Sequence, residues 1–176
     1  MPNIPDTDSV RELADALDDN ISAYVSFFIS FAVIGRYWVA HHRFFALLAR
    51  VDIAFIALNL LYLAFVAFLP FPTAVLGRYF ENPLSLTIYA LTLAAISGME
   101  VVLFRHAQRR ALLQEQMPED VYRWGLTLSL NPVVFFLLSI PVAFISTYLA
   151  VVLWFGGIPI GMIANRWKPR RADEFY

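Results

Sequence analysis

The sequence of 176 residues contains no cysteine, and charged residues make up only 15% of it. Without cysteine, these residues can form neither a disulfide nor a thiolate metal site. The few charges gather at the start, in short connections and at the end, and long stretches between them carry almost none. No stretch is both basic and polar enough to indicate nucleic-acid binding, and the acidic, polar start does not resemble a signal peptide.

Common catalytic and ion-selective motifs are also missing. The chain has no G-x-S-x-G, Walker or H-E-x-x-H motif, and no TVGYG-type filter of an ordinary potassium channel. His41 and His42 are adjacent, so on a helix they point about 100° apart, and no third metal ligand accompanies them. We therefore expect no enzymatic activity, no cofactor and no resident metal.

Apolar sequence is what the chain has in abundance, with 60% hydrophobic residues and a mean hydropathy of +0.63. A soluble domain is only about half apolar. Five apolar runs are long enough, at about 1.5 Å per residue, to approach or cross a bilayer core of roughly 30 Å. They cover residues 21–40, 53–76, 84–104, 124–140 and 142–164. We predict an all-α, polytopic bundle of about five transmembrane helices.

Prolines mark the expected ends of these helices. Pro70 and Pro72 should kink or end the second helix. The pair Asn82-Pro83 is typical of a helix start and should open the third.

The last two apolar runs meet at Pro141, which predicts a tight helical hairpin at that residue. The alternative, one broken helix of about 40 residues, would be about twice the length that a membrane requires. Asn131 precedes Pro132 and is expected at a turn or a helix entry.

Positive charges alternate along the chain. They follow the first, third and fifth runs: His41, His42, Arg43, Arg50, then Arg105, Arg109, Arg110, Arg123, then Arg166, Lys168, Arg170, Arg171. By the positive-inside rule this places the C-terminus in the cytoplasm and the N-terminus outside. We divide the chain into an acidic, polar segment (1–20), a transmembrane bundle (21–165) and a basic cytoplasmic tail (166–176). An outside N-terminus is unusual, and it indicates that one further helix belongs before Met1.

Several polar side chains lie within the spans or at their ends: Arg36, Trp38, His41, Asp52, Asn59, Glu100 and Asn131. They form either a polar belt at the inner leaflet that pins the helices together, or groups with a role in gating or conduction; we weigh the two equally.

Four of these residues form a candidate interhelical polar network. Trp38 and His41 are three residues apart and share a helix face, and Asp52 could accept a hydrogen bond from either. A His41–Asp52 pair would be a pH-sensitive latch; the alternative is an interfacial tryptophan beside a solvated histidine. Asn59 lies about two turns beyond Asp52 and is expected to bond to a neighbouring helix.

At these residues the sequence resembles a known family. The stretch SFAVIGRYWVAHHRFF (30–45), then Asp52, then ALNLLYL (57–63) and FLPFPT (68–73) resembles the transmembrane protein 175 family, which includes an endolysosomal potassium channel and its bacterial relatives. The resemblance covers nearly the whole chain and weakens over the last two spans.

The resemblance implies a six-helix bundle that assembles as a tetramer in bacteria and conducts potassium. It places the pore on a first helix with an R-x-x-x-F-S-D signature, which does not occur in these 176 residues. The first span here matches the family's second, and Trp38, His41, Asp52 and Asn59 match positions expected to hold the first helix. The pore-lining residues cannot be assigned. Three explanations for the absent helix are then open. The one that we favour is that the chain is a fragment or has a misassigned start. The others are that the helix comes from elsewhere, or that the protein is a non-conducting derivative.

We therefore expect a potassium channel homologue of the cell membrane. Its expected partners are the lipid bilayer, potassium ions and further copies of the same chain, with no nucleic acid. The alternatives are a non-conducting membrane scaffold and a secondary transporter, although no internal repeat of the kind that transporters carry is evident.

Overall fold

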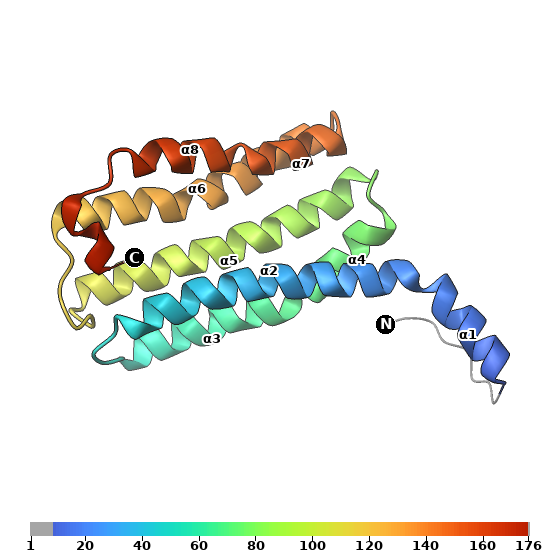
Figure 1. The fold of residues 1–176 in the computed structure, drawn as a ribbon, viewed down its shortest axis with the longest axis horizontal. Helices are drawn as coiled ribbons and strands as arrows, with labels where there is room; N and C mark the ends of the chain where they lie inside the picture. Colours follow the sequence, from blue (N-terminus) through green and yellow to red (C-terminus); the bar gives the residue numbers. More distant parts are fainter. Residues whose placement is uncertain (1–8, 176) are drawn as a thin grey trace.

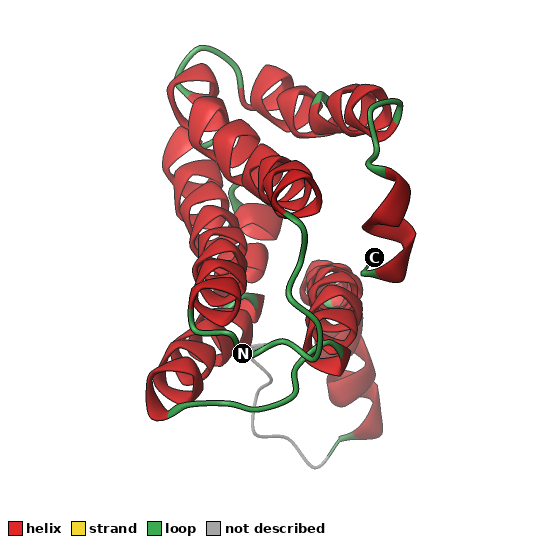
Figure 2. Cartoon of the chain, turned by 90° about the vertical axis from the view of Figure 1, so that its left-hand side faces the viewer, coloured by secondary structure: helices red, strands yellow, loops and turns green. Residues whose placement is uncertain are grey.

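The computed structural model describes residues 9–175, and this part of the chain is built from helices joined by short connections (Figure 1). Figure 2, which looks onto one end of the bundle, shows no strand among these residues. The helices are α1 (Val10–Asp19), α2 (Ile21–Ala46), α3 (Ile53–Phe68), α4 (Pro70–Arg78), α5 (Pro83–Arg109), α6 (Glu119–Ala143), α7 (Thr147–Phe155) and α8 (Gly157–Asn165), followed by the 3-10 turn η1 (Arg170–Glu174).

Four segments in the described part are long and apolar enough to cross a membrane: Ala23–Ala46, Ile53–Arg78, Pro83–Arg109 and Glu119–Ala143. They correspond to the first four predicted runs, and the prediction of an all-α, polytopic bundle is confirmed. The fifth run consists of two shorter helices, α7 and α8, which break at Gly156. The segment predicted to be a polar N-terminal stretch contains the helix α1.

Two predicted helix boundaries are confirmed. The second span is interrupted where α3 ends at Phe68 and α4 begins at Pro70, which has no N–H to donate. Asn82 caps α5 because its side-chain oxygen accepts a hydrogen bond from the Leu84 N–H at 2.9 Å, and Pro83 occupies the first helical position.

The predicted helical hairpin is present, because α6 and α7 pack against each other after a short turn. Its predicted turn at Pro141 is wrong, because α6 continues through both Pro132 and Pro141 to Ala143. A proline inside a membrane helix is tolerated where the surroundings satisfy the backbone groups that it frees. The chain reverses instead at residues 144–146, where the Ser146 hydroxyl accepts a hydrogen bond from the Leu149 N–H at 3.4 Å. Asn131 is likewise not at a turn: it lies within α6 and donates through Nδ2 to the Gly157 carbonyl at 2.8 Å.

The helix α5 forms the centre of the bundle. Over its most apolar window 56% of the residues are buried, against 17% for α2 and 11% for α6. It packs against α3 and α4 on one side and against α6 on the other (Figure 1). The largest fully buried side chains of the core are Tyr62, Phe55, Leu69, Leu86 and Ile96. The exposed apolar surface of α2 and α6 is what lipid contact would require.

Positive charge gathers at one end of the bundle, where the connections 47–52 and 110–118 meet the tail. The Gln114 N–H donates to the Leu47 carbonyl at 2.9 Å, and Arg171 of η1 donates to Glu115 at 2.6 Å. We call this end, at the left of Figure 1, the basic end. Its cationic side chains include Arg43, Arg50, Arg105, Arg109, Arg110, Arg123, Lys168, Arg170 and Arg171.

Candidate functional site: interhelical polar pairs and a cavity beside α2

The first polar pair joins α2 to α3. His41 Nε2 lies 2.8 Å from Asn59 Oδ1, with the histidine as donor. The His41 ring also stacks on Tyr62 of α3, with the ring centroids 5.0 Å apart and the planes 7° from parallel. Phe45, one turn further along α2, stacks on the His41 ring at 4.0 Å. The imidazole is therefore fixed by one hydrogen bond and two ring contacts.

The second polar pair joins the start of α3 to α5. Asp52 precedes α3 in an extended conformation, and its Oδ1 accepts a hydrogen bond from the Phe55 N–H at 2.6 Å. His106 Nε2, from the last turn of α5, lies 3.0 Å from both carboxylate oxygens. The N–H of Phe55 lowers the pKa of Asp52 most, His106 lowers it further, and desolvation opposes both. Asp52 is therefore both a helix cap and an interhelical link.

These pairs differ from the predicted ones. The structure does not join His41 to Asp52, because the Asp52 carboxylate accepts from the Phe55 N–H of its own helix and reaches α5 instead of α2. Trp38 is 62% exposed and stacks on His42, with centroids 5.2 Å apart. Of the four predicted network residues, three thus take part in two separate pairs, and Trp38 belongs to neither pair.

Deeper along the same helices lies a set of contacts that sequence reasoning missed. The Tyr62 hydroxyl donates to Glu100 Oε1 at 3.3 Å, which joins α3 to α5. The hydroxyls of Tyr37 and Ser97 lie 2.9 Å apart and join α2 to α5. Glu100 is the one carboxylate within α5, so a search for its donor among neighbouring tyrosines could have found the first contact.

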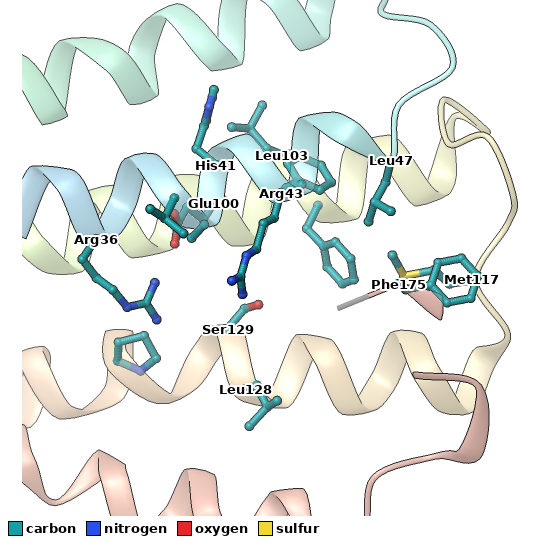
Figure 3. A pocket seen from close by; sticks show the side chains of 15 residues that line it. Arg36, His41, Arg43, Leu47, Glu100, Leu103, Met117, Leu128, Ser129 and Phe175 are labelled. Atoms are coloured by element: carbon teal, nitrogen blue, oxygen red, sulfur yellow. The ribbon is translucent and has the colours of Figure 1, made fainter. Parts of the chain in front are cut away.

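A cavity of about 630 Å³ lies beside these contacts, between α2, α5 and α6 (Figure 3). Arg36, His41 and Arg43 reach it from α2, and Glu100 reaches it from α5. Most of the remaining lining is apolar, with Met117 and Phe175 toward the basic end. Among the described residues, no three side chains are placed to hold a metal ion. The site can fix helices, hold charge and accommodate a ligand.

Comparison with known proteins gives consistent matches. A family model described as Endosomal/lysosomal potassium channel TMEM175 matches residues 1–70. A potassium channel of Chamaesiphon minutus is 37% identical over 140 residues, which cover 73% of this chain and 66% of that protein. A potassium channel of Streptomyces collinus is 36% identical over 110 residues, which cover 60% of this chain and 53% of that protein. The endosomal/lysosomal proton channel TMEM175 of Bos taurus is 34% identical over 86 residues, 46% of this chain and 18% of that protein. Each match thus spans less than two thirds of the relative.

A solved structure also matches. The crystal structure of a lysosomal potassium-selective channel TMEM175 homolog from Chamaesiphon minutus superposes with a TM-score of 0.60 and 31% sequence identity, covering 93% of this chain and 86% of that chain. The resemblance drawn from residues 30–73 is confirmed, and it extends through the bundle. This protein belongs to the TMEM175 family.

Proposed function

We propose that the chain is a subunit of a potassium channel that conducts through an oligomeric helix bundle in the cell membrane. The observation that carries the proposal is the match over 86% of a chain described as a potassium-selective TMEM175 channel homolog. The four long apolar helices and the central position of α5 support a subunit that is itself embedded in the bilayer. As the family resemblance implies, we propose a tetramer of identical subunits.

Within this subunit we propose that Trp38, His41, Asp52 and Asn59 fix the helices on which the pore depends. The pairs His41–Asn59 and Asp52–His106 set the positions of α2, α3 and α5 relative to one another. Trp38 is exposed on α2 and remains available to contact a neighbouring helix, as the resemblance implies for the family's first helix. A selective pore needs a constriction and groups that replace or order the hydration of the ion, and we propose that a helix with the R-x-x-x-F-S-D signature supplies them.

The test is potassium flux into liposomes. Two proteins are compared: the 176-residue chain, and the same chain extended at its N-terminus by a helix with the R-x-x-x-F-S-D signature. We expect potassium-selective flux from the extended protein and none above background from the 176 residues. Extended protein that inserts and assembles but passes no ion would indicate a membrane scaffold instead of a channel. Selective flux from the 176 residues alone would show that these helices build the pore, and the assignment of the pore to the signature helix would be wrong.

We further propose that the basic end faces the cytoplasm. The arginines of three separate segments meet at this end, as the positive-inside rule requires. Because the chain has no cysteine of its own, a thiol reagent can label it only at a cysteine that is introduced by mutation. Glu81→Cys lies in the connection at the opposite end and Gln116→Cys in the basic-end connection 110–118, and both positions are exposed. In intact cells a membrane-impermeant thiol reagent should label the Glu81→Cys variant and spare the Gln116→Cys variant; the reverse pattern would overturn the orientation.

A further inference from the structure

The cavity between α2 and α6 presents two guanidinium groups in a mostly apolar space. Arg36 and Arg43 are seven residues apart, which is two helical turns or about 10 Å along α2. Both side chains extend from α2 toward α6 in Figure 3, and Arg43 points toward Ser129. The cavity thus has a charged wall on α2 and faces a neutral wall on α6.

The two arginines differ in their electrostatic surroundings. Arg36 lies close enough to Glu100 to interact with its charge, and the two groups offset each other within the span. In the described part of the chain Arg43 makes no ion pair and no hydrogen bond. The nearby Ser129 hydroxyl donates to the Gly125 carbonyl of its own helix at 2.9 Å and is not a counter-ion. Among the described residues, the positive charge of Arg43 at the cavity is therefore not paired with a carboxylate.

Arg43 lies near the end of the bundle that we propose faces the cytoplasm. It lies in the last turn of α2, at the basic end, where a membrane interface would meet the bundle. Deeper than Arg43 the cavity is lined by apolar Val39, Ala40, Leu103, Leu128 and Pro132, together with Arg36 and Glu100. Toward the basic end it is lined by Phe44, Leu47, Met117 and Phe175. Its volume of about 630 Å³ is in the range of cavities that bind small molecules. A positive group beside these apolar side chains complements a ligand with an anionic head and a hydrocarbon tail.

We propose that this cavity binds an anionic phospholipid, with the headgroup phosphate on Arg43 and an acyl chain along the apolar wall between α2 and α6. Charge complementarity favours this occupant over a zwitterionic lipid, which brings a positive group as well as a phosphate. It also favours a lipid over a helix from a second copy, which would have to bring a buried carboxylate to Arg43. The proposal does not depend on ion conduction.

The experiment is native mass spectrometry of the purified 176-residue chain in detergent, titrated with phosphatidylglycerol or phosphatidylcholine. A basic side chain near an anionic lipid surface contributes about 1 kcal/mol, which corresponds to about a five-fold change in affinity. We expect the wild-type chain to bind the first phosphatidylglycerol about five-fold more tightly than phosphatidylcholine. Arg43→Gln should remove this preference.

Arg105→Gln is the matched control. Arg105 lies at the same end on α5, is exposed and does not line the cavity, so its loss should leave the first binding event within about two-fold of wild type. Ser129→Phe, which fills the cavity from α6, should weaken binding of phosphatidylglycerol while all surface arginines remain. Equal binding of the two lipids by the wild-type chain would overturn the proposal. So would equal losses in the Arg43 and Arg105 variants, which would indicate diffuse surface charge, and so would unchanged binding in both the Arg43 and Ser129 variants.

Discussion

The two ends of the bundle are held together by different means. At the basic end, directional polar contacts join separate helices: His41 to Asn59 at 2.8 Å and Asp52 to His106 at 3.0 Å. At the opposite end, small residues let the helices approach closely. Ala90 of α5, Ala143 of α6 and Ala150 of α7 meet in a buried cluster with Leu86.

A close approach of helices also occurs where α2 crosses α4. A Cβ added at Gly77 of α4 would clash with the hydroxyl of Ser26 of α2, so a side chain at this position would have to displace Ser26. In a bilayer the hydrophobic effect does not drive helices together, because lipid tails are as apolar as leucine. Close packing and interhelical hydrogen bonds must do so instead. In this protein the His41–Asn59 and Asp52–His106 pairs lie at the basic end and the alanine cluster lies at the opposite end. The end with the hydrogen bonds also holds the charges and the cavity.

The largest effect should come from the small-residue end. Gly77→Leu forces a side chain into the crossing of α2 and α4, and overpacking of this kind costs about 1–3 kcal/mol. Thermal unfolding of the purified protein in detergent should therefore shift to lower temperature. The matched control is Gly98→Leu in α5, since a Cβ at Gly98 meets no heavy atom within 4 Å. If both leucine variants unfold at the same temperature, close approach at Gly77 does not stabilise the bundle.

The sequence predicted the helices better than it predicted their contacts. Charge segregation and run length located the four long helices, and Asn82-Pro83 and Pro70 located two of their ends correctly. These signals are local, because they depend on the cost of charge in a membrane and on the missing N–H of proline.

The position of the hairpin turn and the hydrogen-bond partners of the polar side chains depend on contacts between residues that lie far apart in the sequence. Pro141 suggested a break, yet α6 continues past it and reverses only before the cap formed by Ser146, which was itself a readable helix-start signal. The partner of Asp52 could not be found from spacing because it depends on how α5 is rotated against α3. His106 lies 54 residues away, and no motif in the sequence links it to Asp52. Asn131 was placed at a turn because it precedes Pro132, whereas α6 continues through that proline and Asn131 bonds to Gly157 of another helix.

A smaller effect is expected from Asp52, which tests the polar end. Asp52→Ala removes both the cap of α3 and the link to His106, whereas Arg78→Ala alters only an exposed side chain near Tyr79. The aspartate variant should unfold at a lower temperature than the arginine variant. Asp52→Asn, which keeps an oxygen for the Phe55 N–H, should fall between them. Equal unfolding temperatures for the alanine variants would show that the polar link does not stabilise this end.

The contribution of Asp52 should also depend on pH. The pKa of Asp52 is lower in the folded protein than its ordinary value of 3.8, so the folded state favours the charged carboxylate. The stabilisation is therefore fully present above that ordinary value and is lost as the pH falls through the lower, folded pKa. The difference in unfolding temperature between wild type and Asp52→Asn should shrink under acid conditions, as the pH falls through the folded pKa of Asp52. If the difference in unfolding temperature persists unchanged in acid, it arises from the packing and hydrogen-bond geometry of the Asp52 side chain and not from its charge.

The smallest effect, and the sharpest test of the comparison, concerns His41 and Asn59. A direct deletion of His41 would also remove its ring contacts with Tyr62 and Phe45, so the hydrogen bond must be isolated by a double-mutant cycle. His41→Phe keeps an aromatic ring and removes the donor, and Asn59→Leu keeps the approximate size and removes the acceptor. Interhelical hydrogen bonds in membrane proteins average about 0.6 kcal/mol and reach about 1.7 kcal/mol.

Unfolding of the two single variants and the double variant should give a coupling energy in that range. The corresponding cycle for Tyr37→Phe and Asn59→Leu, whose side chains do not bond to each other, should give a coupling near zero. If the His41–Asn59 coupling is also zero, ring stacking and close packing hold α2 to α3, and the two ends of the bundle are stabilised in the same way.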